Sequence, residues 1–143
     1  MNKAAAIAIV LVTSATLHAD SLEERKFWKG QMDYLNQNLE SASKDCGVKF
    51  SFDWIDKDKL RTAAEKHQNS PYGICISVID EVGSLCRNDA DGKASVVAKI
   101  KGFTCGYSNP RNLDMKGGIV KYMGNNEEAN FSDWAKPWLE KHL

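Results

Sequence analysis

The stretch SPYGICISVIDEVGSLC, residues 70–86, decides how this chain folds, because it predicts a half-buried helix that carries two of the four cysteines. Ser70 is suited to cap the helix, and Pro71 is suited to its first turn, where no intrahelical N–H bond is needed. The polar side chains, Glu81 among them, fall on one face. The apolar side chains recur at steps of three and four and form a stripe that should face a core: Ile74, Cys75, Val78, Ile79, Val82, Leu85 and Cys86.

Cys75 and Cys86 lie too far apart on this helix to bond to each other. Their separation along the axis is about 16 Å at ~1.5 Å per residue, well beyond the reach of a disulfide. Two pairings of the four cysteines remain, Cys46–Cys75 with Cys86–Cys105 and Cys46–Cys86 with Cys75–Cys105. We favour the first, because the preceding helix is expected to run back and bring residue 71 near Cys46.

The N-terminal residues have the three parts of a secretory signal peptide. A basic start is followed by the apolar run Ala4–Val12 and then by Leu17-His18-Ala19. We expect cleavage after Ala19, which leaves one domain, residues 20–143, in the periplasm or outside the cell. The apolar run is much shorter than the ~20 residues that span a bilayer, so no membrane span is expected. Four cysteines in an oxidising compartment predict two structural disulfides.

The charge of the chain excludes some classes of ligand, and its length limits the number of domains. Removal of residues 1–19 leaves 124 residues with 18 basic and 19 acidic side chains, and both signs are interspersed. This balance gives no electrostatic footprint for nucleic acid or for an anionic membrane. The length is sufficient for one domain with a substantial core.

The first half of the mature chain reads as helix, strand and helix. Ser21 and Glu24 form a capping box for a long amphipathic helix that ends before Gly47. Alternating aromatic and polar residues predict a strand over 48–54. Asp56 is placed to cap the second helix, which precedes the central one.

The second half contains the strands that complete the sheet. Residues 93–101 fit either a strand or a helix, and we favour a short helix capped by Asp91 after a polar turn at 88–92. Gly117-Gly118 predicts a hairpin, and with the strand before it this gives a three-strand antiparallel meander. The strands are expected at 103–107, 113–115 and 119–123.

A last helical stretch is expected to start at Ser132, with a kink or two short turns at Pro137. The fold class is therefore α+β, a single small domain in which an antiparallel sheet of about four strands is packed against several helices and held by two disulfides.

Few residues carry the chemistry of an active site. Asp53, Asp56 and Asp58 concentrate carboxylates that could hold Ca²⁺ or form an acid/base pair, but helix capping accounts for Asp56 and Asp58. His67 and His142 read as structural, on the apolar side of a helix and next to the C-terminus. The motifs for nucleophilic serines, phosphate loops, zinc and EF-hand calcium are absent. We expect no catalytic residue, cofactor or metal.

Aromatic residues near the C-terminus are the best candidates for binding. They are Phe131, Trp134 and Trp138, together with Arg111 in the turn after Asn109. The sequence favours an exported, non-enzymatic domain that binds a protein or cell-envelope component, with inhibitors included in this class. The alternative is a small periplasmic hydrolase that uses the three aspartates, with or without a metal, and a third reading is a structural role in the envelope.

Overall fold

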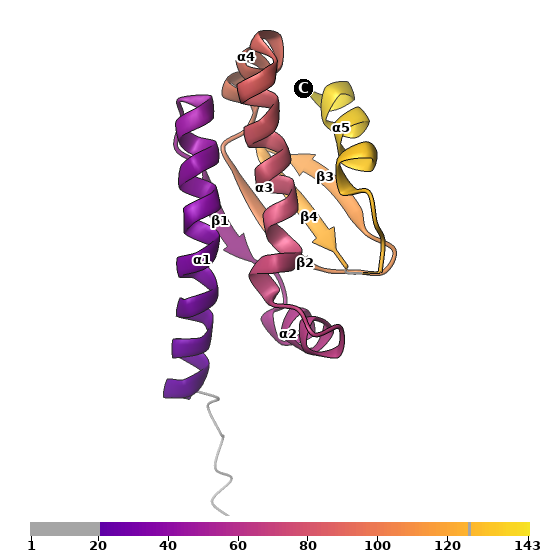
Figure 1. Cartoon of the computed structure of the whole chain (residues 1–143). Coiled ribbons are helices and arrows are strands. Elements are labelled where there is room, and N and C mark those ends of the chain that lie inside the picture. The colour runs from indigo at the N-terminus through magenta and orange to yellow at the C-terminus, as the bar shows by residue number, and fades with distance from the viewer. Residues whose placement is uncertain (1–20, 126) are drawn as a thin grey trace, which may run out of the picture.

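Helices α1, α3 and α5 lie over one face of a four-stranded sheet, with α3 between the other two (Figure 1). The computed structural model describes residues 21–125 and 127–143. Within these residues the elements, in chain order, are α1 (Leu22–Cys46), β1 (Ser51–Trp54), α2 (Lys57–Lys66), α3 (Pro71–Asn88), α4 (Ala90–Lys99), β2 (Gly102–Tyr107), β3 (Asn112–Lys116), β4 (Ile119–Gly124) and α5 (Phe131–His142).

The predicted α+β class, with four strands and two disulfides, is confirmed. Within the part of the chain that is described, each helix is too short or too polar to cross a membrane. The predicted signal peptide, residues 1–19, lies outside the described residues.

The first helix is held at both ends as the sequence predicts. The Ser21 side chain accepts a hydrogen bond from the backbone N–H of Glu24 at 3.1 Å. Gly47 ends the helix with a φ of 78°, a left-handed conformation that costs glycine little. Asp56 caps α2 in the predicted way, since its side chain accepts from the N–H of Lys59 at 3.2 Å.

The strand order is β1-β2-β4-β3, and only the β3–β4 pair is antiparallel. Because β2 runs parallel to both of its neighbours, the predicted antiparallel meander is wrong in its placement of β2. Residues 108–111 carry the chain past the position of β4 to the edge of the sheet, and the hairpin then returns β4 into the gap. Gly117 and Gly118 form the two-residue turn of this hairpin. Their φ values of 62° and 84° are positive, as the preferred two-residue turns between antiparallel strands require.

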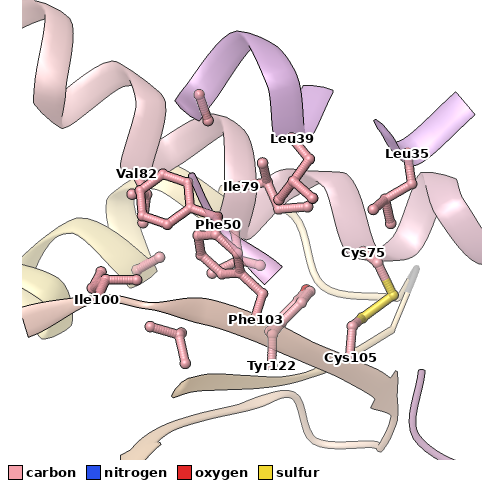
Figure 2. Packing of buried hydrophobic residues seen from close by; sticks show 14 of the residues in the cluster. Leu35, Leu39, Phe50, Cys75, Ile79, Val82, Ile100, Phe103, Cys105 and Tyr122 are labelled. Carbon is pink, nitrogen blue, oxygen red and sulfur yellow. A yellow bond between two sulfur atoms is a disulfide. The ribbon is translucent and has the colours of Figure 1, made fainter. Parts of the chain in front are cut away.

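The apolar stripe of α3 lies at the centre of the core, as predicted. Val78, Ile79 and Val82 have no exposed surface. On the sheet side, Phe103 of β2 meets Phe50 edge to face with 5.3 Å between the ring centroids, and both rings lie beneath the helices (Figure 2). Full burial of one such side chain contributes roughly 1.5–3 kcal/mol, so this layer is a main source of stability.

The disulfides are Cys46–Cys86 and Cys75–Cys105. The favoured pairing, Cys46–Cys75 with Cys86–Cys105, is therefore wrong, and the other of the two remaining schemes is the one that forms. Figure 2 shows the Cys75–Cys105 bridge between α3 and β2. The second bridge joins the C-terminal ends of α1 and α3.

The wrong pairing follows from the direction assigned to α2. Helices α1 and α3 run parallel, because Asn38 bonds to Asp80 and, further along both helices, Asp45 pairs with Arg87. The short α2 lies at the carboxyl end of the parallel strands β1, β2 and β4 and does not return the chain toward the end of α1 (Figure 1). The first turns of α3 therefore begin beside β2, where Cys75 finds its partner.

The C-terminal helices differ from expectation in detail. The ambiguous residues 93–101 are mainly helical, as favoured, but α4 starts earlier because Asp89, not Asp91, is its cap. The Asp89 side chain accepts from the backbone N–H of Asp91 at 3.0 Å, so the turn predicted at 88–92 is reduced to Asp89, between the last residue of α3 and the first turn of α4. Helix α5 continues through Pro137 as one element rather than as two short turns.

Candidate binding groove

A groove separates α3 from α5, and it is mainly polar except at the α4 end. It consists of three adjoining hollows with volumes of about 370, 120 and 190 Å³. The first and second share Glu81 and Ser84 in their walls, and the second and third share Leu85, Asp89 and Glu140. The hollows therefore follow α3 from its middle to the start of α4. We call this feature the α3–α5 groove.

The sequence of α3 produces the floor of this groove. Ser77, Glu81, Ser84 and Asn88 recur at steps of four, three and four, so they form a polar stripe beside the apolar one. The two serines are short and leave space that longer side chains would fill. From the other side, α5 contributes Phe131, Ser132, Lys136 and Glu140 to the walls.

Glu81 is the unusual residue of the groove, because it is a nearly buried acid without a partner. Only 8% of its surface is exposed. Among the residues that the structure describes, none makes a hydrogen bond or an ion pair with its carboxylate. The carboxylate oxygens keep contact with solvent through the two hollows that Glu81 lines, so a ligand in the groove could reach them.

The charged neighbours of Glu81 on α3 are paired with α1 instead. Asp80 accepts a hydrogen bond from the Asn38 amide at 2.9 Å, and the guanidinium of Arg87 pairs with Asp45. On α5, Lys136 lies 3.8 Å from Glu140, and more than half of each side chain is exposed. Each basic side chain that lines the groove therefore already has a carboxylate beside it, and Glu81 is left over.

The structure brings three of the four predicted binding residues together. The guanidinium of Arg111 lies 4.4 Å from the Trp134 ring centroid, and Phe131 meets Trp134 at 5.7 Å. Trp138 does not join them, because it stacks on His142 at 4.0 Å. Phe131 also lines the largest hollow, so this aromatic cluster borders one end of the α3–α5 groove.

Arg111 fixes the loop that leads into α5. Its side chain lies 3.1 Å from the Glu128 carboxylate and donates to the carbonyl of Ala129 at 3.0 Å. Beneath the cluster, burial raises the pKa of Tyr122 to about 12, although the charge of Arg111 opposes the shift. Only 2% of Tyr122 is exposed, and its ring packs on Phe131 at 5.1 Å. The contacts made by Arg111 and Tyr122 are those of a structural support.

The three aspartates proposed for a hydrolase are not assembled into one site. Asp53 accepts a hydrogen bond from the N–H of Trp54 at 2.8 Å, and Asp56 caps α2. Asp58 is exposed in the first turn of the same helix, where a negative charge complements the helix dipole. Within residues 21–125 and 127–143, no group of three acidic, histidine or cysteine side chains is placed to hold a metal ion.

The two histidines of the described chain make local contacts. His67 Nε2 lies 3.1 Å from Glu127 Oε1 but is not aligned for a hydrogen bond. The other oxygen of Glu127 accepts from the Asn109 amide at 2.5 Å. His142 Nδ1 lies 2.7 Å from the carbonyl oxygen of Trp138. These contacts tie loops and helix ends together, and no hollow described above borders them.

Sequence reasoning missed Glu81. The residue falls on the polar face of α3, which is expected to face solvent, whereas α5 covers that flank in the structure. The two tryptophans of α5 could have indicated this burial. A helix that buries two tryptophans must pack against a neighbouring surface, and that surface is then covered.

Comparisons with protein-family models, with curated proteins and with solved structures found no match to this chain. The candidate function therefore rests on the geometry of the groove.

Proposed function

We propose that this protein is an exported, non-enzymatic domain that binds a partner protein through the α3–α5 groove. The observation that carries the proposal is Glu81, a largely buried residue in the wall of two adjoining hollows, whose carboxylate has no partner among the described residues. A polar side chain that has no partner in the free protein and can bond to a group of the ligand is typical of recognition surfaces. Inhibition of an enzyme is one form that such binding takes.

Export is supported by two independent features. The N-terminal residues have the composition of a signal peptide. All four cysteines form disulfides, as expected for a protein that matures in an oxidising compartment such as the periplasm or the extracellular space.

Binding has better support than hydrolysis. A carboxylate pair for acid/base catalysis must converge on the same substrate atoms. Here Asp53 and Asp56 instead accept hydrogen bonds from backbone N–H groups of their own segment.

The proposal is tested by affinity capture with the oxidised protein and a groove-filling variant. Ser84→Phe places an aromatic ring at a residue that lines two of the three hollows. Gln37→Phe adds the same ring at an exposed position of α1 and serves as the control. We expect the wild type and Gln37→Phe to retain the same protein and Ser84→Phe to lose it.

Circular dichroism and disulfide mapping first establish that both variants are folded. Equal capture by Ser84→Phe would show that the partner binds elsewhere. If the folded wild-type protein specifically retains no partner from extracts of the compartment to which it is exported, the proposed function is wrong.

A further inference from the structure

We infer that the α3–α5 groove binds an extended, basic segment of the partner and that Glu81 is the counter-ion for a lysine or arginine side chain of that segment. The inference rests on the proposed function and specifies the chemistry of what is bound. It starts from Glu81, a residue with 8% of its surface exposed, whose carboxylate opens to two hollows and has no partner among the described residues. A carboxylate accepts several hydrogen bonds and donates none, so the group that satisfies it must be a donor, and a cationic donor is the strongest.

Among the described residues that line the groove, no cation is free for this role. Of the basic residues that line the groove, Arg87 pairs with Asp45 and Lys136 pairs with Glu140. Moving Lys136 to Glu81 would leave Glu140 unpaired, so the groove would still carry an excess of negative charge. That excess is increased at the α4 end by Asp89 and Asp91. A cationic ligand is therefore complementary to the two polar hollows beside Glu81.

The length of the groove favours a peptide segment over a small amine. The polar stripe on α3 runs from Ser77 to Asn88, about 16 Å at ~1.5 Å per residue. An extended chain advances ~3.3 Å per residue, so about five residues match this length. A single small cation would occupy only the part of the groove next to Glu81.

The positions of the acidic residues set the spacing of the basic ones. Glu81 and Asp89 are eight residues apart along the helix direction, about 12 Å at ~1.5 Å per residue. In an extended segment, side chains four residues apart point the same way and are separated by about 13 Å. Basic residues at positions i and i+4 therefore match Glu81 and the acidic end of the groove.

Synthetic peptides test this inference on the oxidised protein. The probe is acetyl-Lys-Gly-Ser-Gly-Lys-amide, and the charge control is the same peptide with glutamates in place of both lysines. Binding is followed by NMR titration at low ionic strength. We expect saturable shifts at the backbone amides of Ser77 and Ser84 with the lysine peptide and none with the glutamate peptide.

Two variants separate a specific counter-ion from general attraction. Glu81→Gln removes the charge from the groove and keeps the shape, and Glu40→Gln makes the same change of net charge at an exposed position of α1. Loss of the charge partner in the groove is expected to weaken binding of the lysine peptide by about tenfold. Glu40→Gln should stay within about twofold of the wild type, because exposed charges contribute little.

Equal weakening by Glu81→Gln and Glu40→Gln would overturn the inference, since the attraction would then depend only on net charge. The inference also fails if the wild type does not bind the lysine peptide, or if the lysine peptide binds equally well to Glu81→Gln. The peptide test can fail while Ser84→Phe still abolishes capture of the partner. In that case the proposed function stands, and only the inference that the ligand is basic is wrong.

Discussion

The Asp114 side chain accepts a hydrogen bond from the backbone N–H of Met115 at 2.8 Å, at the outer edge of β3. Lys116 and Ile119 face each other across the hairpin, so the alternation of the ladder directs the N–H of Met115 away from β4. The opposite edge of the sheet has the same arrangement, because Asp53 accepts from the N–H of Trp54 at 2.8 Å. On each edge strand an aspartate thus accepts a hydrogen bond from an outward-facing backbone N–H. If that N–H were free, it could pair with the strand of another chain.

We expect Asp114→Ala to promote self-association. The substitution frees the N–H of Met115 and removes a negative charge from an edge strand. Light scattering at rising protein concentration should show dimers or larger species in Asp114→Ala while the wild type remains unchanged. Asp133→Ala removes the same side chain from an exposed position in α5 and should not associate. Unchanged scattering by Asp114→Ala would mean that the hydrogen bond does not protect the edge.

The disulfide pairing predicts which cysteine double variants keep a bond. Cys46→Ala with Cys86→Ala leaves Cys75–Cys105 intact, so no free thiol is expected. Cys46→Ala with Cys75→Ala leaves Cys86 and Cys105, which are not partners and are buried, so two thiols should react with Ellman's reagent once the protein is denatured. A single thiol-free species in the second variant would contradict the pairing.

Each bridge also contributes to stability. The partners are 40 and 30 residues apart in sequence. Loop-closure entropy changes slowly with length, so removal of either bridge should lower the free energy of unfolding by about 3–4 kcal/mol. Urea denaturation of the two matched double variants measures this. A loss below about 1 kcal/mol for either would show that the bridge constrains the unfolded chain very little.

Local signals in the sequence predicted the elements but not their arrangement. Ser21, Gly47, Asp56 and Ser70 mark helix ends through contacts within a few residues, and each acts as predicted. The position of β4 between β2 and β3 depends on where a four-residue connection crosses the sheet, which no periodicity records.

The candidate site shows the same limit. The aromatic residues near the C-terminus could be found from their type and spacing alone. Glu81 could not, because its burial arises only when α5 packs beside α3. Likewise, the disulfide pairing followed from the direction of α2, a tertiary property that the sequence pattern of a ten-residue helix does not contain.

Two helical glycines should respond in opposite ways to substitution. A Cβ atom at Gly83 of α3 would lie 3.2 Å from the Cβ of Ala42 on α1, whereas one at Gly30 would meet nothing within 4 Å. Gly83→Val is expected to lower the free energy of unfolding by about 1–3 kcal/mol through overpacking. Gly30→Ala should raise it by about 0.5–1 kcal/mol, because alanine loses less backbone entropy in a helix.

Thermal and urea denaturation of the two variants measure both effects. Gly30→Val adds the same side chain as Gly83→Val at a position without neighbours, so the difference between these two variants reports the space at each site. Equal effects of the two substitutions would show that α1 and α3 do not approach as closely at Gly83 as the structure indicates.

Alkaline pH should destabilise the protein through Tyr122. Burial raises the pKa of Tyr122 from 10.0 to about 12, so the phenol ionises more readily in the unfolded chain than in the folded one. The contribution of Tyr122 to stability is therefore complete below pH 10 and is lost as pH rises through about 12. The expected loss over this interval is about 3 kcal/mol.

Urea denaturation between pH 9 and 12 measures this loss, and Tyr122→Phe isolates the residue because it keeps the ring and removes the ionisable group. In this variant the decline of stability over the interval should be smaller by about 3 kcal/mol. Tyr34→Phe removes a hydroxyl from a side chain that is 56% exposed and should leave the decline unchanged. If Tyr122→Phe and the wild type lose stability in parallel, ionisation of another group causes the decline, and the phenol of Tyr122 is not held in its neutral form by burial.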